Sequence, residues 1–386
     1  MSLIKKNIKN ISEYPFTRLR QLLKCTGEDT CFADLSIGQP YHKTPLFVKD
    51  LIYKEKDKWK LYPPINGISL IKKSYLNWLK RRFDVSGFFN EENIVPLCGT
   101  KEGLFSISMI LNLNVICMPN PFYQVYLGPA IANNMRKIFL NTNKKNSFLI
   151  DLNKLKKTLS RNPALVYFCS PTNPQGKIAD YFYLKELIEI IRYYKSVLII
   201  DECYIDIYYQ KKPIGALEVC KKLGNNLNNI IIFHSLSKRS NVAGLRSGFA
   251  LGDKKIIGYY KKFRSYFAPV MPIPIQVASA ELWSDDEHVD SNRKKYKKKM
   301  DLANNIFKNY RHYQSPEAGF FIWLKVANGE GFTKKLFKKY SIKVMPGKYL
   351  AAGKYKNPGQ DYIRIALVHS LEKNKKALSK IAEFLV

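Results

Sequence analysis

The sequence predicts an α/β protein in two parts: a large domain with a mostly parallel sheet flanked by helices, and a smaller α+β domain. Short apolar runs that end in polar or turn residues alternate with longer amphipathic stretches, which is typical of strand–helix–strand units. The length of 386 residues leaves room for about two structural units. Apolar residues make up 46% of the chain and charged residues 25%, so a disordered or collagen-like chain is excluded.

Five apolar runs have the length and composition of buried strands: Val115–Met118, Leu165–Cys169, Val197–Ile200, Ile230–Phe233 and Gly248–Leu251. Three other stretches have the apolar spacing of helices or parts of helices: Lys101–Leu113, Tyr181–Tyr194 and Ala216–Leu223. In a mostly parallel sheet, ligands bind beyond the carboxyl ends of the strands. We therefore expect the functional residues just after the predicted strands.

The pattern changes after the proline-rich stretch Ala268–Pro274, which is a plausible connector. Long Lys-rich helices follow it, and then three predicted strands at Gly319–Val326, Ile342–Met345 and Tyr362–Leu367. We predict a large domain over 51–270 and a small domain over 271–386, to which an N-terminal arm over 1–50 contributes. No internal repeat is visible.

The net charge of +33 first suggests a polyanionic partner. It comes from 51 Lys and only 13 Arg, however, and Arg is the residue that suits bidentate phosphate and base contacts. The basic runs Arg293–Lys299 and Lys334–Lys339 are interrupted by apolar residues at helical spacing. We interpret them as solvated helix faces and expect no nucleic-acid partner.

No signal peptide or membrane-spanning window is predicted, so we expect no membrane partner. The seven cysteines are scattered, and none forms a C-x-x-C pair: Cys25, Cys31, Cys98, Cys117, Cys169, Cys203 and Cys220. This usage favours a reduced, cytoplasmic protein without a metal site.

Two polar clusters follow predicted strands as loops. Leu97–Gly103 is a glycine turn that opens onto a helix, and it is either an anion cradle or an ordinary helix start capped by Thr100. Cys169–Lys177 carries two prolines around Asn173, so it is either a simple turn or a rigid loop that holds the Asn173 amide still.

Two further clusters place charged residues at strand ends. Asp201 directly follows four apolar residues, and a buried carboxylate there needs a cationic partner. A P-loop ATPase is excluded, because the chain has no G-x-x-x-x-G-K-[ST] loop. Lys238 lies just past the run Ile230–Phe233. It is either a solvent-facing loop residue or a desolvated lysine with a reactive free amine.

In this order the four clusters resemble the pyridoxal-phosphate (PLP) site of the class I/II aminotransferases of PLP fold type I, and the resemblance covers nearly the whole chain. The most specific motifs are Ser-Pro-Thr-Asn-Pro-Gln-Gly at 170–176, Asp-Glu-Cys-Tyr at 201–204 and Ser-Leu-Ser-Lys at 235–238. Within the class, the chain is most similar to the N-succinyldiaminopimelate aminotransferases. That similarity rests on less specific stretches, namely Tyr14–Arg20, Ser237–Asn241, Gly244–Phe249, Asn357–Gly359 and Arg364–Val368.

Two residues depart from that pattern or add to it. Ala243 replaces the proline usual in that group, which we expect to alter loop stiffness and not chemistry. His234 precedes the phosphate-binding serine, where it either hydrogen-bonds within the core or titrates near the site.

The resemblance implies a catalytic role for three residues. Lys238 carries the cofactor covalently and later moves a proton between the substrate's α-carbon and the cofactor. Asp201 faces the pyridine nitrogen and keeps it protonated. Tyr204 and Asn173 hydrogen-bond the 3′ oxygen of the ring, and Tyr123 stacks on the ring face.

The resemblance also implies two anion sites. The cofactor phosphate is held by Thr100, the Lys101 backbone, Ser235, Ser237 and Arg246. Tyr62 matches the tyrosine that reaches the phosphate from a neighbouring subunit, which implies a homodimer with shared active sites. Arg364 binds the substrate α-carboxylate as a planar fork, and Gly38 offers its backbone N–H to the same group, which Asn173 also adjoins.

The implied reaction transfers an amino group from N-succinyl-L,L-2,6-diaminopimelate to 2-oxoglutarate, in lysine and diaminopimelate biosynthesis. Other aminotransferases of the class (aspartate, aromatic or LL-diaminopimelate type) and a fold-type-I β-lyase stay open, and a polyanion-binding protein is the remote alternative. The resemblance does not assign the residues that bind the succinyl and distal carboxylate groups. Candidates are Arg18, Arg20, Arg239 and the Lys-rich loops.

Overall fold

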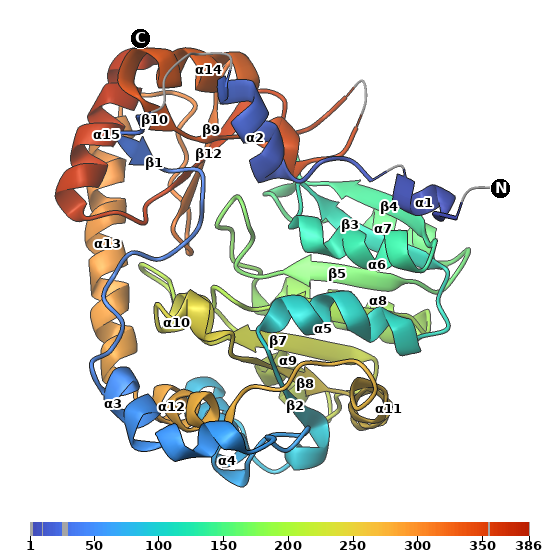
Figure 1. Cartoon of the computed structure of the whole chain (residues 1–386). Coiled ribbons are helices and arrows are strands. Elements are labelled where there is room, and N and C mark those ends of the chain that lie inside the picture. The colour runs from blue at the N-terminus through green and yellow to red at the C-terminus, as the bar shows by residue number, and fades with distance from the viewer. Residues whose placement is uncertain (1–2, 10, 25–29, 354–355, 386) are drawn as a thin grey trace.

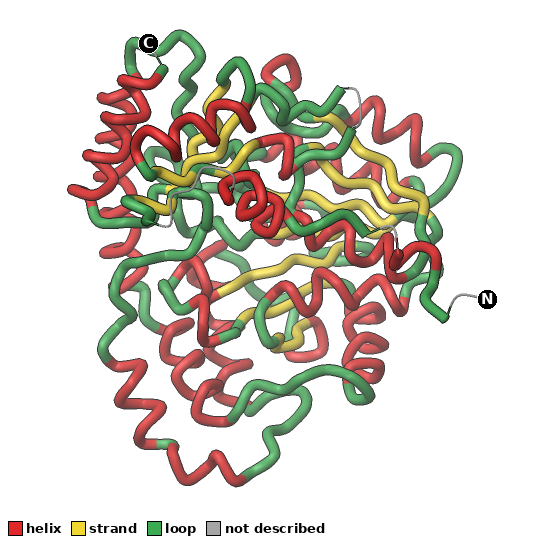
Figure 2. Tube along the Cα trace, turned by 45° about the horizontal axis from the view of Figure 1, so that its top comes forward, coloured by secondary structure: helices red, strands yellow, loops and turns green. Residues whose placement is uncertain are grey.

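The computed structural model describes residues 3–9, 11–24, 30–353 and 356–385. The strands fall into two groups, with helices around both (Figure 2). Cys25 lies outside the described residues.

The larger group is a seven-stranded sheet in the order β2-β8-β7-β6-β5-β3-β4. Its strands are β2 (Ile94–Leu97), β3 (Val115–Asn120), β4 (Arg136–Asn141), β5 (Leu165–Cys169), β6 (Val197–Asp201), β7 (Ile230–Ser235) and β8 (Gly248–Gly252). The pairs from β4 through β7 are parallel. Strand β8 runs antiparallel to both of its neighbours, β7 and β2. The prediction of a mostly parallel sheet is confirmed, and all five predicted strands are present.

Two apolar cores cover the opposite faces of this sheet. Along β6, Leu198 and Ile200 belong to one core, while Val197 and Ile199 belong to the other. This alternation follows from the two-residue period of a strand. Because both faces are buried, these strands are apolar throughout, as the sequence indicates.

The large sheet is covered by helices on both faces. The first core is completed by α4 (Ser69–Phe83), α7 (Leu152–Leu159), α8 (Tyr181–Tyr193), α9 (Ala216–Lys222) and α12 (Ile273–Ser284). The second is completed by α5 (Thr100–Ser106), α6 (Leu127–Ala132) and α11 (Lys254–Arg264). Helix α8 shows why these segments are helical. Asp180 caps its first turn by accepting a hydrogen bond from the Tyr183 backbone N–H at 2.9 Å, and its apolar face is buried.

The second group of strands forms the small domain. Strands β9 (Phe321–Lys325), β11 (Met345–Pro346) and β12 (Tyr362–Ala366) make an antiparallel sheet, and β1 (Ala33–Asp34) pairs in parallel with β10 (Ile342–Lys343). Helices α13 (Glu287–Phe307), α14 (Gly329–Tyr340) and α15 (Leu371–Phe384) contribute to its core. The predicted small α+β unit is therefore present.

The N-terminal arm touches both parts of the molecule. Helix α1 (Lys6–Lys9) contacts α6, α2 (Pro15–Lys24) contacts α14, and α3 (Phe47–Lys54) contacts α12. Helix α12 itself packs on α4, and Trp283 lies in the core of the large sheet. We propose that the domain boundary falls within α13, later than the boundary at 271 expected from the sequence. Figure 1 shows α13 running from the α3–α12 layer to the small sheet.

Candidate active site

The carboxyl edge of the large sheet carries the predicted site. Strands β2, β3, β5, β6 and β7 point the same way, so the residues after them meet at one edge. Arg246 lies at the same edge because it precedes β8, and the amino end of this antiparallel strand lies beside the carboxyl end of β7. The sheet topology thus gathers residues that lie far apart in the sequence.

A cavity of about 480 Å³ opens at this edge and extends toward the small domain. Every predicted site residue except Tyr62 lines it: Gly38, Thr100, Lys101, Tyr123, Asn173, Asp201, Tyr204, Ser235, Ser237, Lys238, Arg246 and Arg364. Among the described residues of the lining, Asp201 is the single carboxylate, whereas four side chains are basic. The cavity is therefore suited to anionic ligands.

Lys238 lies in the one-turn helix α10 (Leu236–Arg239), directly after β7. Ser235 caps this helix, since its hydroxyl accepts a hydrogen bond from the Ser237 N–H at 3.1 Å. The Lys238 ammonium donates to the carbonyl of Gly38. Burial lowers the pKa of Lys238 to about 8, because a shielded ammonium loses hydration.

Asp201 ends β6 and is 4% exposed. It accepts hydrogen bonds from the Tyr126 hydroxyl at 2.9 Å and from the Cys203 N–H at 3.1 Å. Burial raises the pKa of Asp201, and these hydrogen bonds offset the shift only in part. Both donors are neutral, and no ion pair is formed with Asp201 by the described residues. A cationic ligand group would supply the missing charge, and the protonated ring nitrogen of PLP is such a group.

A second part of the cavity carries anion donors. The Thr100 hydroxyl lies at the start of α5, and the Arg246 guanidinium approaches Gly99 so closely that a Cβ there would come within 2.0 Å of Nη2. Only glycine leaves room for this approach, and its φ of +80° also favours glycine. Arg246 donates hydrogen bonds to the carbonyls of Ala243 and Cys98. Hydroxyls, backbone N–H groups and a guanidinium are the donor set that fits a phosphate.

Arg364 lies on β12 and is 5% exposed. Its Nη1 donates to Oδ1 of Asn173 at 3.1 Å, and its Nη2 donates to the Ser36 carbonyl at 2.8 Å. The Phe321 ring packs against the guanidinium at 4.2 Å. Burial lowers the pKa of Arg364 to about 10, and its buried Nε has no partner within the described structure. A buried guanidinium whose charge is not balanced by a carboxylate of the protein is well suited to bind the carboxylate of a ligand.

Gly38 and the aromatic residues complete the wall. A Cβ on Gly38 would come within 2.5 Å of the Phe321 ring, so glycine is required there. The Gly38 carbonyl faces Lys238; this contact differs from the predicted use of its N–H. Tyr204 packs edge-on to Phe321, and Tyr123 lies edge-on to Tyr126.

Tyr62 lies outside the cavity lining and is fully exposed. The three arginines suggested for the distal substrate groups are also absent from the lining. Arg239 is 3% exposed and forms ion pairs with Asp206 and Asp286. Arg18 lies over the Tyr349 ring, and Arg20 is exposed beside Thr17.

His234 belongs to the core. Its two ring nitrogens hydrogen-bond to the Tyr75 hydroxyl and to Oε2 of Glu202, each at 2.7 Å. Neighbouring residues of a strand point to opposite faces, so His234 lies away from Ser235 and from the cavity. Of the two alternatives that the sequence left open for His234, the structure shows the hydrogen-bonded core residue.

Several lining residues were not predicted from the sequence. Tyr126 and Cys203 both support Asp201, and Cys203 also hydrogen-bonds the Thr100 hydroxyl through Sγ at 3.3 Å. Tyr14 joins the cavity from the N-terminal arm. Cys203 could have been found, since it stands two residues after Asp201 in the quoted motif. Tyr14 opens the stretch Tyr14–Arg20, which was quoted for the resemblance alone and assigned Tyr14 no role.

The chain is similar to known aminotransferases over nearly its whole length. The family described as "Aminotransferase class I and II" matches residues 32–381. The LL-diaminopimelate aminotransferase of Dehalococcoides mccartyi is 27% identical over 99% of this chain and 98% of that protein. The crystal structure of an aminotransferase from Neisseria meningitidis has a TM-score of 0.93 at 34% identity, over 99% of this chain and 100% of that one.

A second solved structure agrees with this. The aminotransferase AspB of Helicobacter pylori has a TM-score of 0.91 at 34% identity, over 97% of this chain and 99% of that one. The family match spans most of the chain, and each of the three motifs that carry the resemblance contributes residues to the cavity lining. The protein is a member of the class I and II aminotransferase family, which is PLP-dependent and has fold type I.

Proposed function

We propose that this cavity binds PLP and that Lys238 is the lysine that links to it. The observation that carries the proposal is the complementary placement of Lys238, Asp201 and the anion donors around Arg246 in one cavity. When bound, the cofactor supplies an electron-withdrawing ring that stabilises charge at the substrate's α-carbon.

The residues around the ring have separate tasks. The Lys238 amine, with its lowered pKa, moves the proton between the substrate α-carbon and C4′ of the cofactor. The Asp201 carboxylate holds the proton on the pyridine nitrogen. Tyr204 and Asn173 hydrogen-bond the 3′ oxygen, and Tyr123 packs on the ring.

Anion recognition is divided between the two ends of the cavity. Thr100, Ser235, Ser237 and the Lys101 N–H hold the phosphate together with Arg246. Arg364 holds the substrate α-carboxylate, and the Gly38 N–H adds to this contact. The unpartnered Nε of Arg364 supports the second assignment.

For the amino donor we propose N-succinyl-L,L-2,6-diaminopimelate, with 2-oxoglutarate as acceptor. Three of the four basic side chains of the lining are used by the cofactor or the α-carboxylate, which leaves Lys101 for a second carboxylate. The succinylated donor carries three carboxylates and one amine. It therefore suits a cavity with excess positive charge.

The second candidate donor is LL-2,6-diaminopimelate itself. Relatives with that activity in their name are 27% identical to this chain. This donor has two carboxylates and two amines, so it has no net charge. The two donors thus differ in the charge that the cavity must accommodate.

We also propose a homodimer in which Tyr62 reaches the partner's cofactor phosphate. The segment around Tyr62 exposes several large apolar residues, namely Tyr53, Trp59, Leu61 and Ile65. Apolar surface of this kind is typical of a protein–protein contact. Sedimentation equilibrium tests the assembly, and Tyr62→Phe should weaken PLP binding only in the dimer.

Visible absorbance tests the cofactor assignment. Protein purified with PLP should absorb in the visible region, and Lys238→Ala should lose both this band and transamination. Lys185→Ala is a matched control, because the Lys185 side chain on α8 is partly exposed and, among the described residues, forms an ion pair with Glu189 alone. A colourless wild-type protein that PLP does not restore would contradict the assignment.

A panel of amino donors tests the substrate. Half-reaction rates, followed at the cofactor band, should be highest with the succinylated donor. A higher rate with LL-diaminopimelate selects the second candidate. A clear preference for aspartate or an aromatic amino acid refutes both.

A further inference from the structure

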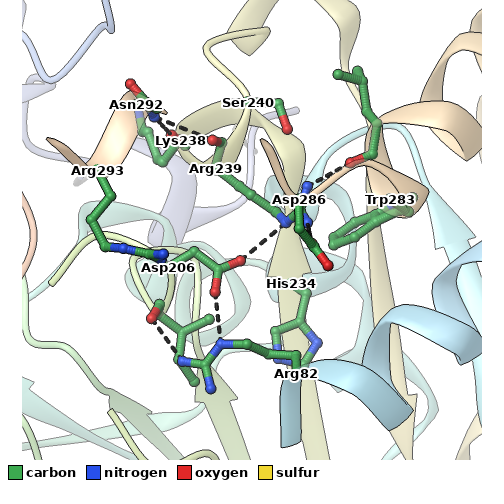
Figure 3. A network of polar contacts seen from close by, with 12 residues as sticks. Arg82, Asp206, His234, Lys238, Arg239, Ser240, Trp283, Asp286, Asn292 and Arg293 are labelled. Atoms are coloured by element: carbon green, nitrogen blue, oxygen red, sulfur yellow. Dashed lines mark hydrogen bonds and ion pairs between the residues drawn. The ribbon is translucent and has the colours of Figure 1, made fainter. Parts of the chain in front are cut away.

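The C-terminal end of helix α10, which carries Lys238, accepts hydrogen bonds from the side-chain amide of Asn292. Asn292 of α13 is 3% exposed, and its Nδ2 donates to the carbonyls of Lys238 at 3.3 Å and Arg239 at 3.2 Å (Figure 3). The last carbonyls of a helix have no partner within it. In a helix of only four residues, Asn292 therefore satisfies half of the backbone acceptors.

The orientation of this amide is fixed by groups on its other side. Oδ1 of Asn292 accepts from Nδ2 of Asn241 at 3.1 Å and lies 2.7 Å from Nδ1 of His42. Nε2 of His42 lies 2.6 Å from the Lys299 ammonium. When Lys299 is an ammonium it can only donate, so Nε2 of His42 accepts from it and Nδ1 carries the hydrogen that faces Asn292. A flipped amide would place donors against donors and oxygen against oxygen.

The same chain of contacts reaches the small domain. Lys299 is 3% exposed, lies two helical turns after Asn292 on α13, and also donates to the carbonyl of Val368 at 3.3 Å. Val368 follows β12, which carries Arg364. Burial lowers the pKa of Lys299 to about 7, and burial together with Lys299 lowers the pKa of His42 to about 4. A neutral His42 is consistent with its accepting from Lys299.

We propose that Asn292 is a positioning residue for Lys238, whose amide is held in one orientation by His42 and Lys299. The inference rests on the proposed role of Lys238. Asn292 touches the backbone of Lys238 and not its amine, so it acts by fixing the direction from which the side chain enters the cavity. The contacts from Asn292 through His42 and Lys299 to the Val368 carbonyl also connect α10 to the small domain, which carries Arg364.

The test compares Asn292→Ala with Asn304→Ala in the PLP-loaded enzyme. Asn304 lies on the same helix, far from α10, and within the described part of the chain its side chain accepts a hydrogen bond from Tyr313 alone. Asn292→Ala should lower kcat about tenfold while KM for the amino donor changes less than about twofold. The pH midpoint of the visible band should move by at least about half a unit, and the apoenzyme should capture PLP more slowly. Asn304→Ala should leave all four quantities unchanged.

A purely structural role gives a different result. If Asn292→Ala lowers the melting temperature but keeps the wild-type band midpoint and kcat, the proposal is overturned. If Asn292→Ala does not yield folded protein, Lys299→Met decides. Lys299→Met should also move the band midpoint away from its wild-type value, because the amide of Asn292 is then held less firmly through His42, and a wild-type midpoint overturns the proposal. A wild-type protein without a visible band instead refutes the cofactor assignment.

Discussion

Arg364 and Arg239 are both buried arginines, but their surroundings differ. Arg364 lines the cavity, donates to an amide oxygen and a backbone carbonyl, and faces no carboxylate of the described chain. Arg239 is the last residue of α10, and its side chain forms ion pairs with Asp206 at 3.0 Å and with Asp286 at 2.6 Å. Arg82 pairs with the other oxygen of Asp206 at 2.7 Å (Figure 3).

The charge of Arg239 is compensated by carboxylates of the protein, whereas the charge of Arg364 is available to a ligand. Although burial acts to raise the pKa of Asp206, Arg82 and Arg239 hold it below its usual value of 3.8. The three groups compensate one another within the protein. The charge of Arg364 has no such partner, so a substrate carboxylate would complete it. Burial of an arginine is therefore uninformative until its partners are known.

The largest effect on stability is expected when the ion pairs of Arg239 are removed. Arg239→Met should lower the free energy of unfolding by about 3–5 kcal/mol, because Asp206 is left partly uncompensated in the core. Urea denaturation measures this. Arg81→Met is the matched control, since Arg81 pairs with the same Asp286 but both side chains are about half exposed. That variant should lose at most about 1 kcal/mol, and equal losses in the two would contradict the distinction.

Arg364→Met should give the opposite pattern. The unfolding free energy should stay constant or rise, because an unpaired buried charge is removed. KM for the amino donor should increase about 30- to 100-fold, equivalent to about 2–3 kcal/mol for a charge-assisted contact. Steady-state kinetics beside urea denaturation measure both quantities. A destabilised Arg364→Met variant with a wild-type KM would contradict this prediction and would show that Arg364, like Arg239, stabilises the fold.

The lowered pKa of Lys238 predicts a pH dependence of cofactor capture. Only the neutral amine attacks a carbonyl, so the apoenzyme should take up PLP about tenfold faster per pH unit up to about pH 8 and then level off. Between about 8 and the ordinary value of 10.5, the unfolded chain holds a proton that the folded one lacks. Lys238 therefore makes the unfolding free energy rise with pH in that window. A capture midpoint near 10.5 would show that the cavity does not desolvate this lysine.

The smallest effect is expected at the exposed cation of the cavity. Lys101→Met keeps the backbone N–H and should raise KM for the succinylated donor about fivefold, since solvent screens an exposed ion pair. A donor with one carboxylate serves as the internal control and should be unaffected. The effect should shrink at high salt. An equal rise for both donors would indicate a role in cofactor binding instead.

The strand positions and most of the site could be predicted because they depend on short-range sequence. Buried parallel strands are apolar runs; Asp201 directly follows one such run, and Lys238 lies shortly after another. The basic runs were also interpreted correctly in large part, since Lys294, Lys295, Lys297 and Lys298 are exposed on α13. Lys299 belongs to the same run but is buried. Nothing in the local sequence separates it from its neighbours.

The rest of the site depends on contacts between distant segments. Tyr126 and Asp201 are 75 residues apart, and Asn292 lies 54 residues from Lys238. Arg239 was one of the candidates for binding the distal substrate groups, yet its side chain lies outside the cavity lining and forms ion pairs with Asp206 and Asp286. Whether a charged residue faces a ligand or a partner is decided by the packing of other elements around it.

From the amino-acid sequence we could predict the fold class, the strands that carry the site in their order along the chain, and the residues at the ends of these strands. Hydrophobic periodicity and loop motifs are local properties, and parallel strands bring their carboxyl ends to one edge. Which buried charges are compensated became clear from the folded arrangement. His234 lies in the core, Arg239 belongs to an ion-pair network and Arg364 faces the cavity. The energy of a buried charge depends on its neighbours in space, and these come from every part of the chain.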